Sequence, residues 1–424
     1  MKRVVLALAL PLLLEAQGIS ELFDALQKQP ISKIDAMNSK MAKISQKKVT
    51  SSYYPKLNMF ASYTHYNSPT NLRPLSPIEA AKLTSKNEPL PFSTTIQKVG
   101  LKLSMPIFMK ELSSLSQKAK FLAKSAKTKK KINFYENEAI ILGANASLQY
   151  LDNLLVAMHS TQNSLQKTKH DITISVNSGR MPGIELDKID EKLNQLDTSI
   201  NNVKIKRLNL ISKIAELTNI TIKHSLAMSL TQEINSDEII LLKPLRDSID
   251  ASLSDLQATK DARYYPKVFL NGMYSKNYAQ DNVKDERDLD VGYGYYEVVL
   301  SMPLYDRGKS IDIELKKIAL MKSKMKLEKT KQELQAQIKS LKDGIVLLKK
   351  SKKLNDENIQ NQKNLLKYAK MSFDEGRMTQ EDYLRYEDAL LNAKSAYFEV
   401  VSQIWQNIGK LAVIYGVDLK EIVR

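Results

Sequence analysis

Side chains that could hold a metal ion or attack a substrate are few in this sequence. It has four histidines (His65, His159, His170 and His224) and no cysteine. Without cysteine there is no disulfide, no thiolate metal site, no thiol nucleophile and no lipid attached through an N-terminal cysteine. His159 and His170 lie eleven residues apart (170 − 159) and would share one face of a helix, but no HExxH motif or carboxylate cluster accompanies them. We therefore predict no metal site and no cofactor.

The glycine motifs do not build a nucleotide-binding or acyl-transfer site either. Gly292-Tyr293-Gly294 lacks the third glycine of a dinucleotide fingerprint and lies in a strand-like stretch. The segment 179–183, Gly-Arg-Met-Pro-Gly, is not followed by the Gly-Lys-Ser/Thr of a phosphate-binding loop. No G-x-S-x-G nucleophile elbow occurs. The sequence indicates that the protein is not an enzyme and has no catalytic residues.

The N-terminus has the organisation of a signal peptide, residues 1–16. Lys2 and Arg3 precede the apolar run 4–14, and Ala16 is a small residue at a plausible cleavage point. After it, no stretch approaches the roughly 18 apolar residues of a spanning helix. The mature chain is expected to leave the cytoplasm, either as a soluble protein or as one that enters a membrane as a β-barrel.

The net charge of +17 has to be interpreted together with export. A basic chain with the cluster Lys127, Lys129, Lys130 and Lys131 would ordinarily suggest nucleic acid. No aromatic residues interleave with these lysines, and an exported protein does not meet DNA. We predict no nucleic-acid partner, and we interpret the cluster as a solvated face of a long helix.

Three short motifs occur twice in the same order, which indicates an internal duplication. The pairs are Tyr-Tyr-Pro-Lys at 53–56 and 264–267, Ser-Met-Pro-Ile/Leu at 104–107 and 301–304, and Gly-Arg-Met at 179–181 and 376–378. The last two pairs have the same offset, 301 − 104 = 376 − 179 = 197. Two copies of one architectural unit therefore make up most of the chain.

Each copy begins with two stretches in which apolar residues alternate with mostly polar ones. This period of two predicts the strand pairs 53–66 with 96–107 and 264–278 with 292–305. Lys102 and Ser104 are expected on the opposite, aqueous face, and the proline-rich loop 67–95 is expected to be irregular. The pattern fits either an ordinary half-buried hairpin or a strand between lipid and a lumen. In the second case the residues facing lipid would be Leu57, Met59, Leu101, Leu103, Val268, Leu270, Val298 and Leu300.

The rest of each copy is predicted to be a helical hairpin, 109–218 and 307–414. No proline lies between Pro106 and Pro182 or after Pro303, so each outgoing run could extend on the order of 100 Å. Gly179 and Gly376 are expected at the reversals because glycine adopts positive φ without strain. The returning helix of the first copy has a heptad seam, formed by Leu186, Ile189, Leu193, Leu196, Ile200, Val203, Leu210, Ile214 and Leu217.

These features in this order resemble the outer-membrane efflux protein family, the TolC-like channels. The clearest local match is the stretch 373–384, Phe-Asp-Glu-Gly-Arg-Met-Thr-Gln-Glu-Asp-Tyr-Leu, followed by Leu390, Ala393, Ala396 and Tyr397. It is similar to the second hairpin tip and returning helix of that family. The resemblance covers nearly the whole mature chain.

The resemblance implies an α+β fold in a homotrimer with an internal duplication. Each chain would give four strands to a shared twelve-stranded β-barrel in the outer membrane of a Gram-negative bacterium, and four helical runs to a long periplasmic α-barrel. The first repeat would span 17–218, including N-terminal helices, and the second 263–414. Residues 219–262 would form connecting helices of an equatorial belt, and 415–424 a C-terminal tail.

The function that the resemblance implies is the exit duct of a tripartite efflux or type I secretion system. Such a duct carries drugs, other small molecules or proteins from an inner-membrane pump through a periplasmic adaptor (membrane fusion) protein. We expect the hairpin tips to dock that partner; their residues are Gly179, Arg180, Met181, Gly376, Arg377 and Met378.

Relatives often carry acidic residues just after the second tip, where the periplasmic entrance narrows. Asp382 fits that pattern, but Arg385 does not, and the first repeat has Glu185 and Lys188 at the same offsets. Each acid lies three residues before the base, a spacing that brings side chains together on a helix. We therefore expect a gate held partly by ionic contacts rather than an acidic ring.

Two alternatives remain from the residues themselves. A soluble periplasmic coiled-coil protein, for instance an adaptor that binds such a channel, would also have long hairpins. The two duplicated strand pairs favour the channel, because adaptors usually have one hairpin. A DNA-compacting coiled coil would require a cytoplasmic location.

Overall fold

The computed structural model describes residues 18–234, 236–280 and 288–424, so the expected signal peptide lies outside the described residues. The chain divides into two compact units. The hairpin unit contains the described residues up to Ser39 together with Ser125–Leu245 and Lys326–Arg424. The sheet unit contains Lys40–Lys124 and Arg246–Met325. The elements are α1 (Ile19–Lys28), α2 (Pro30–Ser51), β1 (Lys56–Asn71), α3 (Pro77–Ser85), β2 (Phe92–Met109), α4 (Lys110–Asn177), α5 (Ile184–Thr218), a 3₁₀ turn η1 (Ile240–Leu242), α6 (Lys243–Tyr264), β3 (Lys267–Gln280), β4 (Asp288–Ser301), α7 (Arg307–Asp374), α8 (Gln380–Tyr415) and α9 (Leu419–Ile422).

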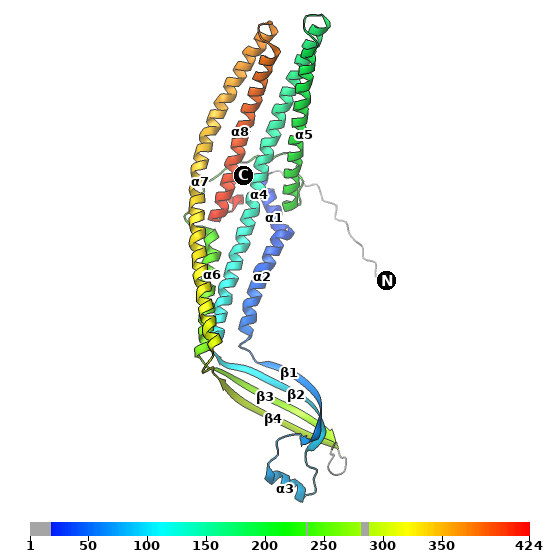
Figure 1. Cartoon of the computed structure of the whole chain (residues 1–424), viewed down its shortest axis with the longest axis vertical. Helices are drawn as coiled ribbons and strands as arrows, with labels where there is room; N and C mark the ends of the chain where they lie inside the picture. Colours follow the sequence, from blue (N-terminus) through cyan, green and yellow to red (C-terminus); the bar gives the residue numbers. More distant parts are fainter. Residues whose placement is uncertain (1–17, 235, 281–287) are drawn as a thin grey trace, which may run out of the picture. The chain divides into compact units, whose positions relative to one another are not determined.

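The four strands form one antiparallel sheet in the order β1-β2-β3-β4 (Figure 1). The two strand pairs expected from the repeats therefore join through β2 and β3. The fold is α+β with a duplicated strand pair and a duplicated hairpin, as the sequence predicted.

The strands are displaced from their predicted bounds. β1 continues past 66 to Asn71, and a register shift between His65 and Thr70 accommodates the extra residues. β2 starts at Phe92 rather than at 96, whereas β4 runs from Asp288 to Ser301 and ends before 305. A bulge follows Pro106 in β2, because proline has no N–H for the ladder.

The loop between β1 and β2 contains regular structure where an irregular loop was expected. Helix α3 begins at Pro77 after the N-cap Ser76, whose side chain accepts from the Glu79 N–H. Proline suits the first turn of a helix, where its missing N–H has no intrahelical partner. The four prolines of this loop, Pro74, Pro77, Pro89 and Pro91, therefore did not exclude a helix.

The hairpins repeat closely, as the absence of proline predicted. Helices α4 and α7 each have 68 residues, and their returning partners α5 and α8 have 35 and 36. Figure 1 shows α4 with α5 and α7 with α8 as two hairpins. The predicted seam of α5 packs into the core: Ile189, Leu196, Ile200 and Val203 are buried in one cluster with Leu165 of α4.

The largest cluster of buried apolar residues gathers five helices of the hairpin unit. α1 contributes Ile19, Leu22, Phe23 and Leu26, whose spacing of three and four residues places them on one face. They pack with Ile141 of α4 and with residues of α5, α8 and α9. The expected C-terminal tail is thus part of this core.

The stretch 219–262 is helical only in its second half, in α6. Residues 219–234 and 236–239 contain no helix, and Leu230 instead forms an antiparallel bridge with Val423. The Ser229 N–H donates to the carbonyl of Arg424 at 2.7 Å, which ties this stretch to the C-terminus.

Candidate functional site

The two hairpin turns have the same hydrogen-bond geometry. Gly179 and Gly376 both have φ of 72°, the positive value predicted for them. The Arg180 N–H donates to the Ser175 carbonyl at 2.8 Å, and the Arg377 N–H donates to the Ser372 carbonyl at 2.8 Å. These six-to-one bonds, with the five-to-two bonds of the glycines, define a Schellman motif. No atom lies within 4 Å of a Cβ built on either glycine, so the backbone angle alone selects glycine there.

The tip side chains next to these glycines are mostly on the surface. Arg180 and Arg377 are exposed, while Met181 and Met378 are half-buried. The Arg377 Nε lies 3.3 Å from the Glu375 Oε2, so this guanidinium already has a local acidic partner.

The predicted gate residues form ion pairs within their own helices. Lys188 Nζ lies 2.9 Å from Glu185 Oε1, and that hydrogen bond raises the pKa of Lys188. Arg385 lies 3.6 Å from Asp382 but only 2.9 Å from Glu381, an acid that the gate hypothesis did not include. Asp382 also contacts Thr379, the N-cap of α8: its N–H donates to the Thr379 hydroxyl at 3.1 Å, and its carboxylate accepts from that hydroxyl at 2.7 Å.

A buried polar cluster near the tips joins the two hairpins and was not predicted. Tyr383 on α8 is 2% exposed and donates to Glu387 Oε1 at 2.7 Å. Ser164 on α4 donates to the same carboxylate oxygen and lies 3.1 Å from the Tyr383 hydroxyl. Burial and the neighbouring Glu387 raise the pKa of Tyr383 to about 12. The available signal was the spacing of four residues between Glu387 and Tyr383, which lies 197 residues after the seam residue Leu186.

A second link between the hairpins is ionic. Lys192 Nζ of α5 lies 2.5 Å from Asp388 Oδ2 of α8. Together with the tyrosine cluster, it connects α8 to both helices of the first hairpin. Near their tips the hairpins are thus joined by polar contacts as well as by Leu384 and Leu391 of α8, which pack against the α4–α5 cluster.

The eight predicted lipid-facing residues lie on one face of the sheet, called here the apolar face. The cross-strand register pairs Leu57 with Leu103, and residues that pair directly in an antiparallel ladder point to the same side. Likewise Val268 pairs with Leu300 and Leu270 with Val298. Leu300 is 67% exposed, and Leu57, Met59, Leu101 and Val298 are also exposed, while Leu103, Val268 and Leu270 are half-buried. The part of the chain that the structure describes leaves most of this face uncovered.

The opposite face of the sheet, called here the polar face, has a ladder of hydrogen-bonding side chains. Ser104 donates to Asn271 Oδ1 at 2.9 Å, and Asn271 Nδ2 donates to Glu297 Oε1 at 3.1 Å. Lys102 and Ser104 lie on this face, as predicted. The two faces therefore suit two different solvents.

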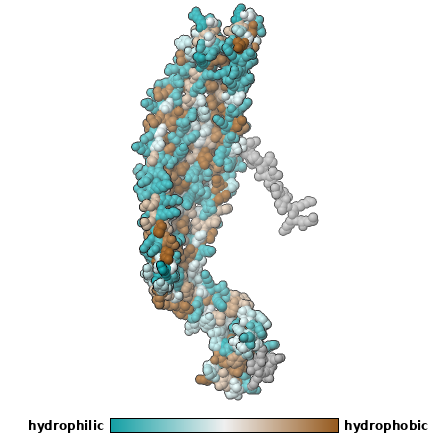
Figure 2. Space-filling view, in the orientation of Figure 1, coloured by the Kyte–Doolittle hydropathy of each residue, from teal (hydrophilic) through white to brown (hydrophobic). Residues whose placement is uncertain are grey.

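Two helices of the sheet unit also expose apolar stripes. On α2 the exposed residues include Met41 and Ile44, and on α7 they are Ile311, Leu315, Ile318, Met321 and Met325. Figure 2 shows apolar patches within the largely hydrophilic surface where α6 and α7 lie. Stripes of this kind on a monomer usually mark an interaction surface.

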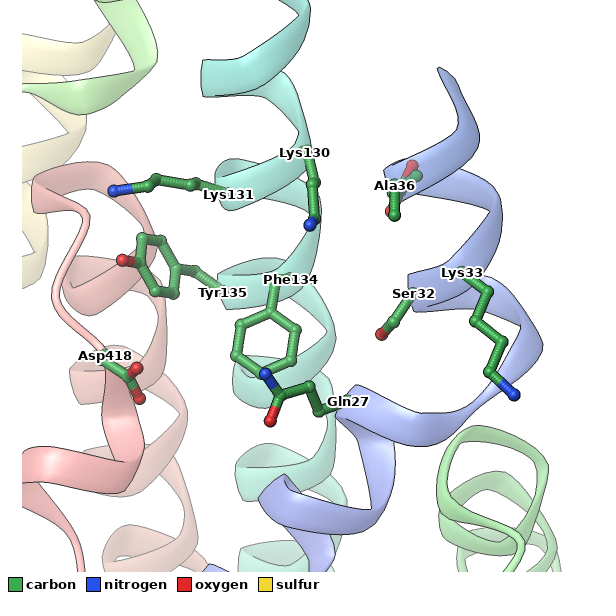
Figure 3. Close-up of a pocket in the computed structure, with 10 residues that line it drawn as sticks. Gln27, Ser32, Lys33, Ala36, Lys130, Lys131, Phe134, Tyr135 and Asp418 are labelled. Atoms are coloured by element: carbon green, nitrogen blue, oxygen red, sulfur yellow. The ribbon is translucent and has the colours of Figure 1, made fainter. Parts of the chain in front are cut away.

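A cavity of about 360 Å³ lies in the hairpin unit between α2, α4 and the start of α9 (Figure 3). Phe134 and Tyr135 of α4 form its apolar wall, and Lys33, Lys130 and Lys131 give it positive charge. Asp418 lies beside Tyr135. Two members of the lysine cluster in the sequence thus line a cavity instead of only a solvated face.

Asp418 also borders a fully buried acid, Glu138. The Leu419 N–H donates to Glu138 Oε2 at 3.3 Å, whereas Oε1 has no hydrogen-bond partner. Burial, reinforced by the charge of Asp418, raises the pKa of Glu138 to about 9. This carboxyl is therefore protonated at neutral pH.

Within 18–234, 236–280 and 288–424, no group of three or more His, Asp or Glu side chains could hold a metal ion. Among those residues, no helix is long and apolar enough to cross a membrane.

The fold matches solved structures of outer-membrane channels. The Campylobacter jejuni CmeC outer-membrane channel superposes with a TM-score of 0.78 at 15% identity, over 94% of this chain and 85% of that one. The outer-membrane protein VceC from Vibrio cholerae gives 0.78 at 14% identity, over 94% and 97%. The open state of the Neisseria gonorrhoeae MtrE channel gives 0.75 at 14% identity, over 94% and 89%. The chain has the fold of these channels.

This finding confirms, at the level of the fold, the resemblance inferred from the sequence. No protein-family model and no curated protein sequence matches the chain. What the chain shares with these solved structures is therefore the fold.

Proposed function

We propose that the protein is an exit duct in the outer membrane of a Gram-negative bacterium, with a large periplasmic portion. It would carry drugs, other small molecules or proteins from an inner-membrane pump to the exterior, in a tripartite efflux or type I secretion system. The observation that carries this proposal is the uncovered apolar face of a sheet whose reverse side has the Ser104–Asn271–Glu297 ladder. The fold shared with outer-membrane channels supports it. The proposal assigns the protein no catalytic step.

The duct requires more than one chain, and we propose a homotrimer. Among the described residues, β1 and β4 each pair with one neighbouring strand only, so both edges of the sheet are open there. Open edges pair with other strands, and joining β4 of one copy to β1 of the next satisfies both. Three copies of four strands would close a barrel of twelve. The apolar face would then meet lipid, and the polar face would line the lumen.

The exposed helix stripes fit the same head-to-tail contact. α2 leads directly into β1, and α7 directly follows β4. In the sheet unit, Figure 1 places α2 and the start of α7 on opposite sides of α4 and α6. A ring that joins β4 to the next β1 would therefore also bring the α7 stripe of one copy towards the α2 stripe of the next.

The tips and the gate complete the proposal. The twin Schellman turns would dock the periplasmic adaptor, with Arg180 and Arg377 as exposed donors and Met181 and Met378 as apolar contacts. The pairs Glu185–Lys188 and Asp382–Arg385 would contribute to the closed periplasmic entrance.

A crosslinking experiment in outer-membrane fractions tests the duct and its ring together. The chain has no cysteine, so Met41→Cys on α2 and Met321→Cys on α7 are the only sites for a bis-maleimide. Both side chains are exposed. The double variant should give covalent dimers and trimers from the outer membrane, whereas Met41→Cys alone should stay monomeric on a denaturing gel. Combining Met41→Cys with Leu208→Cys, an exposed position on α5, is the matched control.

Two results would contradict the proposal. Recovery of the protein from the soluble periplasmic fraction would favour the alternative, a periplasmic coiled-coil adaptor. Dimers formed by Met41→Cys alone would indicate a twofold contact between α2 helices instead of a ring.

A further inference from the structure

The segment that joins β1 to β2 folds back over the polar face of the sheet. We call this segment, residues 72–91, the strap. Its two ends meet, because the Leu72 N–H donates to the Pro91 carbonyl at 2.9 Å. Figure 1 shows the strap, with α3, at the end of the strands opposite to their connections with α2, α4, α6 and α7.

The start of the strap crosses β2 to reach the two farther strands. Leu72 is 2% exposed and packs in a cluster with Ile96 of β2 and Leu289 of β4. Its carbonyl accepts from Asn277 Nδ2 of β3 at 2.5 Å. A residue that follows the edge strand β1 therefore contacts all three other strands.

The strand register shows which face the strap covers. Ile96 pairs with Ala279, which pairs with Leu289, so all three point to one side of the sheet. Asn277 lies two residues before Ala279 on the same side. By the same parity this is the side of Asn271, hence the polar face. No other segment within 18–234, 236–280 and 288–424 covers the apolar face in this way.

The polar groups that anchor the strap to the sheet are buried, and they have hydrogen-bond partners. Asn277 is 1% exposed, and its Oδ1 accepts from the Ser275 hydroxyl at 3.0 Å. Farther along the strap, Arg73 lies 2.5 Å from Glu79 of α3. A surface loop with its own packing and paired buried polar groups holds a defined conformation. The strap is therefore an ordered element of the sheet unit.

We propose that the strap narrows the outer mouth of the duct and limits the size of the solute that leaves it. This inference rests on the proposed function, in which the polar face lines the lumen. The opposite strand ends lead into the helices, so the strap stands at the exterior end. In a ring of three chains, symmetry places three copies around the axis.

Thiol labelling of intact cells tests the strap. Lys102→Cys places a single reporter on the polar face, and Leu101→Cys places one on the apolar face as its control. Cells that carry either variant are treated with one of two thiol reagents. One is a small sulfonated thiosulfonate, and the other is a maleimide on a polyethylene glycol chain of several kilodaltons. With the strap intact, only the small reagent should label position 102, and neither should label position 101.

The same labelling is repeated after the strap is shortened or released. Replacing residues 73–90 by Asn-Gly leaves a two-residue connection between Leu72 and Pro91, whose backbones are already hydrogen-bonded through the Leu72 N–H. A milder variant, Leu72→Ser with Asn277→Ala, removes the anchors only. Both should let the large reagent label position 102 at the rate of the small one. Ile78→Ser, an exposed change within the strap, should leave the exclusion unchanged.

The outcomes separate the two claims. If the large reagent labels position 102 equally with and without the anchored strap, the strap does not narrow the mouth, while the duct stands. If position 101 is labelled and position 102 is not, the faces are reversed, which overturns both the proposed function and this inference.

Discussion

Glu138→Gln should stabilise the protein increasingly as the pH rises. Glu138 is 0% exposed, and one of its carboxyl oxygens has no partner. Its pKa is raised from 4.5 to about 9, first by burial and then by Asp418. Glutamine has the shape of the protonated acid, can still accept from the Leu419 N–H and cannot ionise. The substitution thus fixes the state that the fold prefers.

The magnitude follows from proton linkage. Between the unfolded pKa and the folded pKa, the folded state keeps a proton that the unfolded state has lost, so stability falls as pH rises. The slope is about 1.4 kcal/mol for each pH unit. From pH 5.5 to 8.0 the wild type should therefore lose about 3 kcal/mol through this group, and Glu138→Gln should lose none of it.

Denaturant unfolding at several pH values measures the effect. Trp405 is the only tryptophan, and it packs against the cluster that contains Leu142 and Ala412, so its fluorescence reports on this region. Exposed Glu328→Gln is the matched control and should keep the wild-type pH profile. If wild type and Glu138→Gln lose stability with the same slope, Glu138 is not a buried protonated acid and the reasoning is refuted.

Three further changes test the sheet, the turns and the gate. Leu300→Arg should cost about 2–4 kcal/mol if Leu300 lies at the middle of the bilayer, seen as loss of heat-modifiable oligomer; ready labelling of Leu300→Cys by a water-soluble reagent would contradict this. Gly376→Ala should cost about 1–2 kcal/mol because of its φ of 72°, and amide exchange at the turn should rise, whereas Gly183→Ala at φ −60° should not change it. Asp382→Asn and Arg385→Gln should ease channel opening, each pair contributing no more than about 1 kcal/mol; unchanged single-channel conductance and salt dependence in both would remove them from the gate.

The helices could be predicted from the sequence because local signals determine them. Proline is absent from both 68-residue helices, and a glycine with positive φ lies in the turn that follows each of them. These are properties of the backbone at single positions, and they do not depend on which chain segment lies beside them. The α5 seam could be predicted as well, because its heptad period appears within one continuous segment.

The strand ends could not be predicted, because they depend on the neighbouring strand. Met105 and Pro106 continue β2 because they pair with Leu270 and Phe269 of β3. The equivalent motif after Ser301 ends β4, because Ser301 already pairs with Lys267, where β3 begins. The same four-residue motif is therefore strand in one repeat and not in the other.

The cluster of Tyr383 and Glu387 escaped prediction for a related reason. The spacing of four was visible, but the third member, Ser164, is 219 residues away from Tyr383 on another hairpin. The gate hypothesis relied on pairs within one helix, and it missed Glu381, which lies closer to Arg385 than Asp382 does. Contacts between the two hairpins can be predicted only when the arrangement of the hairpins is known.

The unsatisfied surfaces of the chain constrain how copies can join. A twofold dimer formed through β1 would pair β1 with β1, and both β4 edges would stay open; a dimer through β4 leaves β1 open in the same way. Only a head-to-tail contact uses β1 and β4 in one interface, and it must close into a ring or grow into a filament. A closed ring puts every copy of the uncovered apolar face on its outside and every strap on its inside. In the proposed ring, the open strand edges pair to form the barrel wall, and the exposed leucines contact lipid. The strap over the polar face narrows the mouth.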